Sequence, residues 1–461
     1  MNKKIKVLTL GDHPMSPSGV GTQSKNVFES LLKSGKFQIL SLAGAIKHRD
    51  YQPIQIDPWG EDFRVIPIDG YGDPEMIRSV LRNERPDMIW FMTDPRFYEW
   101  LWEMENEIRP LCPLVYYHVW DNFPLPFFNA KFYKSTDHVA CISRVTKECV
   151  NGVAPNVSCN YIPHAVNPDM FVSLKTEERQ ALKEKILPEK DRDKFILFWN
   201  NRNARRKQSG SVLWWYGEWV KERGLSGKVQ LIMHTDPTDS HGQDLQQIAN
   251  HLNLDNREVV FSTTKVPTNQ MPGFYNVADV TLNIADAEGF GLATLESLSC
   301  GTPVIATMTG GMQDQVMTAN GAAGVALYPV SKAIIGSQQV PYIYEDRIAD
   351  KQFKNALSQI YDGGEEYRRE LGALGREHIM TNYKFKDFMN GKIDEIENRF
   401  PTENDLTTHL STIFTENRLK KYIELRSMDT CGWDCLCAGP AFNVGMLYGN
   451  IDEVYELISK W

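Results

Sequence analysis

The stretch Glu288-Gly289-Phe290-Gly291-Leu292-Ala293-Thr294-Leu295-Glu296 carries the strongest signal in this chain. It follows the apolar run Val280–Ile284, which predicts a strand, so Glu288 is expected on a turn from a strand into a helix. Gly289 and Gly291 leave room for backbone N–H groups to approach a ligand, and the N-terminus of the following helix attracts negative charge. Glu296 falls about two turns along that helix, from where it could accept hydrogen bonds from ribose hydroxyls. The stretch therefore predicts a site for a diphosphate or for a network of sugar hydroxyls.

Short apolar runs recur on both sides of this stretch with helical patterns between them, which is typical of parallel α/β layers. The predicted strands of the first half are Ile5–Leu10, Phe37–Ala43, Phe63–Ile68, Met88–Met92, Leu114–Val119 and Val139–Ile142. Those of the second half are Phe195–Trp199, Val229–Met233, Val259–Phe261, Val280–Ile284 and Val304–Ala306. We expect two similar doubly wound domains that enclose a cleft, with ligands beyond the carboxyl ends of the strands.

The bulk composition agrees with two globular domains. With 461 residues the chain exceeds one ordinary core, and its 42% hydrophobic and 24% charged residues are those of a globular protein. A formal net charge of -9 argues against binding to nucleic acid by bulk electrostatics. The N-terminal apolar run is broken at Gly11, so it predicts a strand and not a signal peptide, and no apolar stretch of about 18 residues predicts a transmembrane helix. We expect a cytoplasmic protein.

The run from Glu288 to Glu296, followed by Cys300-Gly301-Thr302-Pro303-Val304-Ile305-Ala306, resembles the E-x7-E signature of retaining family 4 glycosyltransferases, the glycosyl transferases group 1 type. As a bare pair of carboxylates around a turn, Glu288 and Glu296 would be read as solvated residues. The resemblance implies the α/β GT-B fold, with two Rossmann-like domains facing across a cleft. Ala293 stands where the family usually has Pro, which leaves the preference for a donor sugar open.

The segment Thr176–Lys194 is rich in Glu, Lys and Arg and poor in strand formers, so it predicts a charged helix and linker between the domains, and residues after about 400 lie outside the resemblance. We expect an acceptor-side domain over residues 1–175, a charged linker over 176–194 and a donor-binding domain over 195–385. Residues 386–461 are expected to hold a crossover helix and a C-terminal extension. In that tail Arg418–Leu425 and Val454–Trp461 have helical patterns, and Cys431–Gly439, with its C-x3-C-x-C spacing, reads as a loop with free thiols.

Basic residues follow the first strand of the second half, in Trp199-Asn200-Asn201-Arg202-Asn203-Ala204-Arg205-Arg206-Lys207. This segment resembles the family's loop in which an Arg and a Lys grip the donor diphosphate, with Arg202 and Lys207 at the expected spacing. Two cations there would offset the charge that develops on the departing diphosphate. Arg205 and Arg206, taken alone, are interpreted as a solvated basic loop.

Two further glycine turns resemble donor-site loops of the family. Ser16-Pro17-Ser18-Gly19-Val20-Gly21-Thr22 links the first strand to a helix, and the resemblance places Gly19 and Gly21 opposite the donor phosphates. This loop is not the G-x-G-x-x-G of dinucleotide enzymes. Thr309-Gly310-Gly311-Met312-Gln313-Asp314 resembles the family's Gly-Gly-x-x-Glu turn, and the backbone N–H groups of Gly310 and Gly311 are expected on the donor site.

The end of the strand Leu114–Val119 offers His118 and, shortly after it, Asp121. In the family a His at this strand end lies beside the donor sugar, which makes His118 a predicted catalytic residue together with Glu288, Arg202 and Lys207. The register leaves an alternative, because Trp120-Asp121 also aligns with the family's His-Asp pair. Tyr161-Ile162-Pro163-His164-Ala165-Val166-Asn167-Pro168-Asp169-Met170-Phe171 is similar to a strand and turn of the family and is interpreted as structural.

The reaction that the resemblance implies is a retaining, metal-independent transfer of a hexosyl-type sugar from a UDP- or GDP-sugar, without a cofactor. Asp191-Arg192-Asp193 has the D-x-D form of metal-dependent transferases, but it lies in the charged linker and is interpreted as a solvated loop. A nucleotide-sugar epimerase and a non-catalytic nucleotide-sugar-binding module are the other readings. The oligomeric state is open.

The acceptor is left open by the sequence. A glycan or lipid-linked saccharide is the default, and hydroxymethylated phage-type DNA is an alternative. Aromatic residues are dense in the first half, where they are either core residues or platforms for a sugar or an extruded base. They are Trp90, Phe91, Phe97, Tyr98, Trp100, Trp102, Phe123, Phe127 and Phe128.

Overall fold

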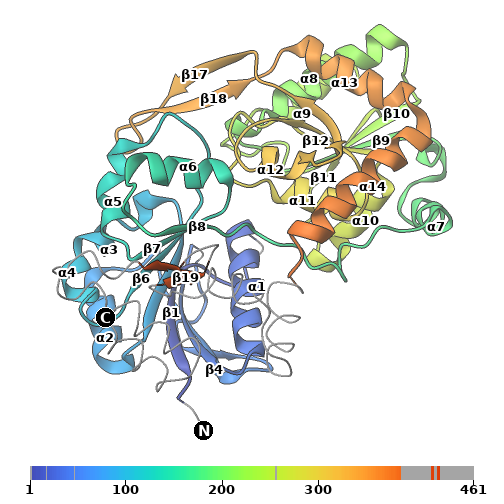
Figure 1. Cartoon of the computed structure of the whole chain (residues 1–461). Helices are drawn as coiled ribbons and strands as arrows, with labels where there is room; N and C mark the ends of the chain where they lie inside the picture. The colour runs from blue at the N-terminus through green and yellow to red at the C-terminus, as the bar shows by residue number, and fades with distance from the viewer. Residues whose placement is uncertain are drawn as a thin grey trace. The chain divides into compact units, whose positions relative to one another are not determined.

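A computed structural model describes residues 3–16, 18–45, 47–254, 257–385, 417–419 and 423–425. The chain divides into two compact units, Met1–Lys386 and Asp387–Trp461. The first unit contains a mainly parallel sheet and a fully parallel one, with helices packed against them (Figure 1). In the second unit the strands β19 (Asn417–Leu419) and β20 (Ile423–Leu425) form an antiparallel pair.

The antiparallel pair of the second unit corrects one expectation. The helix predicted over Arg418–Leu425 is wrong at its described residues, because these form strands. Ile423 and Leu425 flank Glu424, which is the alternation that suits a strand. The predicted helix Val454–Trp461 and the loop Cys431–Gly439 lie outside the described residues.

The sheet of the first half has eight strands in the order β3-β4-β2-β1-β5-β6-β7-β8. The strands are β1 (Ile5–Asp12), β2 (Phe37–Gly44), β3 (Ile54–Ile56), β4 (Gly60–Pro67), β5 (Met88–Thr93), β6 (Leu114–His118), β7 (His138–Cys141) and β8 (Cys159–Tyr161). Only the edge strand β3 runs antiparallel to its neighbour, among the strands described for this sheet. The central strands are apolar and buried because helices cover both faces.

The sheet of the second half has six parallel strands in the order β11-β10-β9-β12-β13-β16. The strands are β9 (Phe195–Asn200), β10 (Val229–His234), β11 (Val259–Ser262), β12 (Val280–Asn283), β13 (Val304–Thr307) and β16 (Gly324–Leu327). Two antiparallel ribbons stand apart from it: β14 (Met317–Thr318) with β15 (Gly321–Ala322), and β17 (Ser331–Ile335) with β18 (Ile343–Arg347). The α/β architecture predicted from the sequence is confirmed.

The helices connect the parallel strands, and several of them begin at a side-chain cap. Ser18, Asp73 and Ser143 each accept a backbone N–H at the start of a helix, which satisfies a donor that has no partner within that helix. The helices are α1 (Gly19–Lys33), α2 (Pro74–Glu84), α3 (Glu99–Glu103), α4 (Glu105–Ile108), α5 (Ala130–Lys134), α6 (Arg144–Val153), α7 (Thr176–Ile186), α8 (Ser209–Arg223), α9 (Leu245–His251), α10 (Met271–Val277), α11 (Leu292–Ser299), α12 (Met312–Val316), α13 (Asp350–Asp362) and α14 (Gly364–Asn382). Short 3-10 turns are η1 (Pro95–Phe97), η2 (Phe127–Asn129), η3 (Glu189–Asp191), η4 (Arg205–Lys207) and η5 (Thr268–Gln270).

The two halves share one buried apolar cluster. It includes Tyr117 and Ile142 of the first half together with Phe290 and Met312 of the second. After α14 the chain returns to the first half, where the N–H of Val166 donates to the carbonyl of residue 383 over 2.8 Å. These contacts fix the strand ends of one sheet opposite those of the other.

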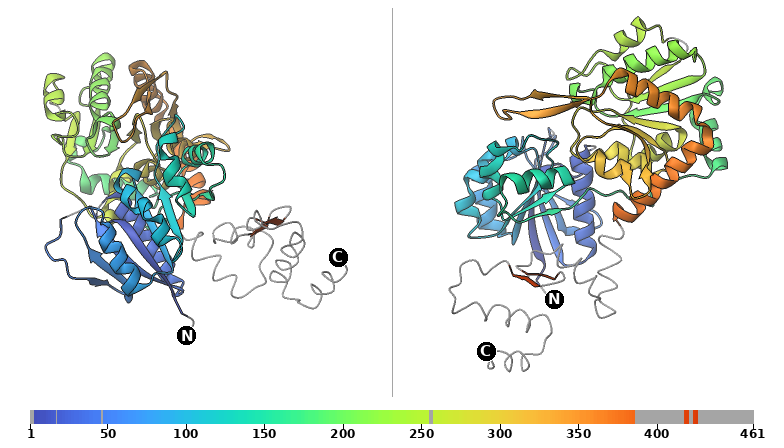
Figure 2. Two further views of the ribbon diagram at one scale, coloured as in Figure 1. Left: turned by 90° about the vertical axis from the view of Figure 1, so that its left-hand side faces the viewer. Right: turned by 45° about the horizontal axis from the view of Figure 1, so that its top comes forward.

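The β17–β18 ribbon is the most distinctive addition to the second half. Figure 2 shows it, in orange, reaching over the helices of the first half in the right-hand view. The N–H of Tyr344 donates to the carbonyl of Phe123 over 2.6 Å, and the Asn122 amide donates to Asp346 over 2.8 Å. The ribbon is therefore hydrogen-bonded to the loop that follows β6.

Candidate active site

Parallel strand order brings the predicted basic loop and the Glu288 loop to one edge of the second sheet. β9 and β12 are neighbours, with Leu197 opposite Val280. Because parallel neighbours end on the same side of a sheet, the loops that follow them open together. For the same reason, the loops after the neighbouring strands β1, β5 and β6 lie together at one edge of the first sheet.

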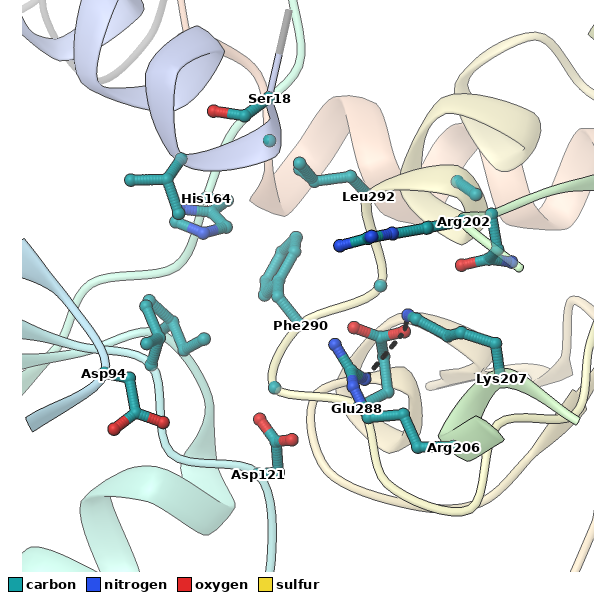
Figure 3. Close-up of a pocket in the computed structure, with 18 of the residues that line it drawn as sticks. Ser18, Asp94, Asp121, His164, Arg202, Arg206, Lys207, Glu288, Phe290 and Leu292 are labelled. Carbon is teal, nitrogen blue, oxygen red and sulfur yellow. Dashed lines mark hydrogen bonds and ion pairs between the residues drawn. The ribbon is translucent and has the colours of Figure 1, made fainter. Parts of the chain in front are cut away.

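These loops line a pocket of about 940 Å³, a volume in the range of ligand sites. Loops from both halves contribute to it, from Ser18 and Asp94 in the first half to Lys207 and Glu288 in the second. Figure 3 shows Lys207 and Arg206 pointing toward Glu288, with Asp94 and Asp121 among the side chains from the other half.

Glu288 is the centre of the charged cluster. The ammonium group of Lys207 donates a short hydrogen bond to the Glu288 carboxylate, and the Arg206 Nη1 atom lies 3.9 Å from the same oxygen. Burial alone would raise the pKa of Glu288, but the charges of Lys207 and Arg206 outweigh it and hold that pKa below its ordinary value. Burial lowers the pKa of Lys207, and the attraction of Glu288 opposes this. Glu288 is therefore an ionised carboxylate held between two cations.

Arg206 is a pocket residue that the sequence interpretation assigned to solvent. Its side chain is 44% exposed, and its Nη1 atom donates to the carbonyl of Ala287 over 2.8 Å. Arg205, beside it in sequence, is turned away and pairs with the buried carboxylate of Glu345. Both belong to the 3-10 turn η4, where successive side chains point about 120° apart. The geometry of this turn therefore points Arg206 into the pocket and Arg205 away from it, although the two residues are identical.

Arg202 also lines the pocket, but its guanidinium is engaged elsewhere. Its Nε atom donates to Asp239 over 2.7 Å and its Nη2 atom lies 2.8 Å from the Nδ1 atom of His241. Arg202 and Lys207 were predicted to act as a pair. In the structure Arg206 and Lys207 converge on Glu288, and Arg202 lies against an acidic partner of its own.

The glycines around Glu288 allow close packing of backbone. Gly291 precedes α11 with φ of 93°, a left-handed conformation that favours glycine. A side-chain carbon on Gly289 would lie 2.8 Å from Asp121 Oδ1. Gly289, Phe290, Gly291 and Leu292 all line the pocket, and the first turn of α11 has N–H groups without partners inside the helix.

Gly310 and Gly311 lie behind this loop, which differs from the prediction that their N–H groups line the donor site. Gly311 donates its N–H to the carbonyl of Glu288 over 3.1 Å, so that group is already used. A side-chain carbon on Gly311 would lie 2.7 Å from the carbonyl oxygen of Gly289. The turn supports the Glu288 loop from outside the pocket.

Glu296 projects into the pocket from the first turns of α11. The hydroxyl of Tyr275 donates to it over 2.6 Å, and the Asn200 amide donates to that same hydroxyl over 2.9 Å. Burial raises the pKa of Glu296 to about 7. The predicted ribose-binding carboxylate thus lies in the pocket and titrates near neutral pH.

The loop after β1 faces the loop that begins α11 directly. A side-chain carbon on Gly19 would lie 3.0 Å from Leu292 Cδ1. Gly19 lines the pocket, whereas Gly21 packs on the loop behind it, where a side-chain carbon would lie 2.6 Å from the carbonyl oxygen of His13. The structure therefore brings Gly19 to the pocket and leaves Gly21 in a packing role.

His118 is not among the residues that line the pocket. Its imidazole is fully buried between the hydroxyls of Tyr116 and Tyr133, at 3.0 and 2.8 Å. Burial lowers the pKa of His118 to about 3, so the ring stays neutral. The placement does not support the predicted catalytic role, and Asp121, the alternative, lines the pocket instead. Burial raises the pKa of Asp121, an effect that Arg206 opposes.

Other predicted features fall outside the pocket. Asp191 of the D-x-D sequence is buried and paired with Lys194 and Arg257, so it is not part of a solvated loop as predicted. No cluster of metal-binding side chains occurs among the described residues. Of the aromatic residues considered as stacking platforms, Phe91, Tyr98 and Trp102 belong to the core of the first half, and none of the set lines the pocket among the residues described there.

Sequence comparison identifies two families along the chain. Residues 218–369 match the family described as glycosyl transferases group 1. Residues 340–461 match glutamate-cysteine ligase family 2. The chloroplastic glutamate–cysteine ligase of Solanum lycopersicum is 48% identical over 83 residues, which are 18% of this chain and 16% of that enzyme. The ligase of Nicotiana tabacum is 49% identical over 79 residues, 17% of this chain and 15% of the enzyme. The chain thus spans about a sixth of these relatives.

Structural comparison covers most of the chain. A sucrose-phosphate synthase from Thermosynechococcus elongatus has a TM-score of 0.66 at 17% identity, over 86% of this chain and 98% of that one. The Anabaena protein HepE, in complex with UDP and glucose, has a TM-score of 0.60 at 13% identity, over 85% and 99%. An α,α-trehalose 6-phosphate synthase from Burkholderia multivorans has a TM-score of 0.60 at 12% identity, over 86% and 98%. At these identities the likeness concerns the fold.

Among the described residues, none of the helices is long and apolar enough to cross a membrane. The family match covers Glu288 and Glu296, and the resemblance first drawn from those residues is confirmed. Residues 218–369 thus match the glycosyl transferases group 1 family, and the chain has the GT-B fold.

Proposed function

We propose that this chain transfers a sugar from a UDP- or GDP-sugar to a hydroxyl acceptor, with retention of configuration and without a metal ion or cofactor. The observation that carries the proposal is the convergence of Lys207, Arg206, Glu288 and Glu296 on one pocket beside the start of α11. A diphosphate needs cations and N–H donors, and a sugar needs carboxylates that accept from its hydroxyls.

In the proposed reaction the acceptor oxygen bonds to the anomeric carbon as the bond from that carbon to the diphosphate oxygen breaks. The acceptor proton leaves with the diphosphate, so no protein nucleophile is needed. Lys207 and Arg206 stabilise the charge that grows on the leaving group, an effect larger in the transition state than in the ground state. Arg202 joins them if its guanidinium leaves Asp239. Glu288 orients the donor sugar and Glu296 accepts from the ribose.

The acceptor that we propose is a glycan or lipid-linked saccharide. Hydroxymethylated DNA is less supported, because the aromatic residues considered for base stacking do not line the pocket where it is described. The match to part of a glutamate–cysteine ligase covers about a sixth of those enzymes, and we propose no ligase activity from it.

The test is incubation of the full chain with a panel of nucleotide sugars, followed by product analysis. Slow hydrolysis of one donor, with transfer to a hydroxyl acceptor, is the expected result. Isomerised donor would indicate an epimerase, and binding without turnover would indicate a binding module. Glu288→Ala and Lys207→Ala should each abolish turnover. Arg223→Ala, at a surface pair with Asp362, is the matched control.

A further inference from the structure

We propose that the β17–β18 ribbon forms the acceptor-side wall of the pocket and selects a neutral acceptor that carries an apolar group. This proposal rests on the proposed function and adds the class of acceptor to it. The ribbon belongs to the second half in sequence, yet Ile335, Val340 and Ile343 line the pocket together with Asp94 and Asp121 of the first half.

The position of the ribbon is fixed at both ends. Toward the first half, the hydroxyl of Tyr342 donates to the carbonyl of Leu125 over 3.3 Å, and its ring packs edge-on against Phe128 with centroids 5.0 Å apart. Toward the donor loops, the N–H of Asp346 donates to the carbonyl of Asp286 over 2.8 Å. The ribbon thus connects the loop after β6, which carries Asp121, with the loop before Glu288.

The ribbon contributes three aliphatic side chains to the pocket, beside Gly336 and Ser337 of its turn. Ile335 and Ile343 are direct cross-strand partners, so their side chains share one face of the ribbon. Val340, in the turn between the strands, adds a third aliphatic group to the pocket lining. All three are half-buried, so a ligand that covers their exposed surface removes apolar area from water, which favours binding. This wall therefore favours a ligand with an apolar group.

The charges on this side of the pocket disfavour an anionic acceptor. Among the described pocket residues of the first half, Arg96 is the only cation, and it is engaged with Asp94 through two hydrogen bonds of 2.8 Å. His164 is neutral because burial lowers its pKa to about 3. Asp121 adds a carboxylate, and the other cations of the pocket, Arg202, Arg206, Lys207 and Lys265, come from the second half. A phosphate on the acceptor would face Asp121, whereas a hydroxyl could donate to it.

The two observations point to one occupant. Its reacting hydroxyl lies toward Asp121 and the donor sugar, and its apolar part packs on Ile335, Val340 and Ile343. Alkyl and aryl glycosides both have this chemistry. A free sugar lacks the apolar part, and a sugar phosphate has a charge that this wall does not compensate.

The experiment measures kcat/KM of the full chain, with its active donor, for glucose, octyl glucoside, phenyl glucoside and glucose 6-phosphate. We expect the better glucoside to exceed glucose by about tenfold or more, equivalent to about 1.4 kcal/mol, and glucose 6-phosphate to fall below glucose. The octyl and phenyl arms distinguish a lipid-like from an aromatic group. Equal values for glucose and both glucosides, or a preference for glucose 6-phosphate, would overturn the proposal.

Variants locate the effect on the ribbon. Val340→Asn and Ile343→Asn should each lower the ratio of glucoside to glucose kcat/KM by about threefold or more, through the KM of the glucoside. Val340→Ile should keep the ratio. Ile334→Asn is the matched control, because Ile334 lies on the outer face and is 55% exposed. An unchanged ratio in Val340→Asn and Ile343→Asn would overturn the role of the ribbon. Absence of turnover with every donor would overturn the proposed function itself, and this proposal with it.

Discussion

The ammonium group of Lys207 lies against the carboxylate of Glu288, and each side chain is only 11% exposed. Their backbone positions come from the loops after two neighbouring strands, β9 and β12, so the sheet itself brings them together. Each charge offsets the cost of burying the other. Glu288 thereby stays ionised in an environment that would otherwise protonate it, and can accept hydrogen bonds from a sugar.

Removal of Lys207 alone should strongly destabilise the fold. Lys207→Met leaves the Glu288 carboxylate buried with Arg206 as its remaining partner, at a cost of about 3 kcal/mol. The double variant Lys207→Met, Glu288→Gln should recover much of that loss, because no buried charge then lacks its partner. Urea unfolding of the single and double variants measures the difference. A Lys207→Met midpoint equal to that of the parent chain would contradict the burial of the pair.

Arg206 should contribute more to turnover than its neighbour in sequence. Arg206→Ala is expected to lower kcat by about tenfold to a hundredfold, because the cation nearest to Glu288 after Lys207 is lost. Arg205→Ala is the matched comparison. It should affect stability more than kcat, since Arg205 pairs with Glu345. Steady-state kinetics with saturating donor would test this, and equal kcat losses in both variants would contradict the assignment.

Donor binding should weaken below neutral pH. Burial raises the pKa of Glu296 to about 7, so this group carries a proton below that pH and a negative charge above it. Only the carboxylate can accept from two ribose hydroxyls, so the KM of the donor should rise as the pH falls from 8 to 6. Glu296→Gln should raise the KM at pH 8 and flatten its pH dependence. A parent KM that is constant from pH 6 to 8 would contradict this role.

His118 should act on stability and not on the chemistry. His118→Leu leaves the hydroxyls of Tyr116 and Tyr133 without their ring-nitrogen partners, which costs about 1–3 kcal/mol. The pH profile of kcat should keep its shape, because the ring is neutral across the working range. Asp121→Asn should instead lower kcat with little loss of stability. A changed pH profile in His118→Leu would restore the histidine as a catalytic candidate.

The strands were predictable where both faces are buried. Runs such as Leu114–His118 and Phe195–Asn200 are apolar almost throughout, and only a covered parallel strand accommodates that composition. The ribbon β17–β18 was missed because its sequence does not alternate polar and apolar residues: the apolar Ile334 is exposed and stands next to the half-buried Ile335. Its contacts with Asn122 and Phe123 join residues about 220 positions apart in the sequence.

The residues around Glu288 that line the pocket were predictable from their spacing along the chain. Gly289 lies too close to Asp121 for a side chain, and Gly291 has a positive φ. A turn that needs glycine at such positions can be recognised from the sequence alone. The choice between His118 and Asp121 was not predictable, because it depends on which side of β6 is covered. Tyr116 and His118 share a face by the two-residue period of a strand, and Tyr133 of α5 lies over that face.

The sequence by itself therefore determined the α/β class, the family resemblance, and Lys207, Glu288 and Glu296 as pocket residues, because these depend on local periodicity and on loops that directly follow strands. The tertiary structure alone decided which of three arginines faces Glu288, which residue of the β6 end reaches the pocket, and where the β17–β18 ribbon lies. Those outcomes depend on partners distant in sequence, such as Asp239 for Arg202 and Glu345 for Arg205. Ion pairs and packing between distant parts of the chain decide which of several similar side chains reaches the pocket, and the sequence alone does not distinguish them.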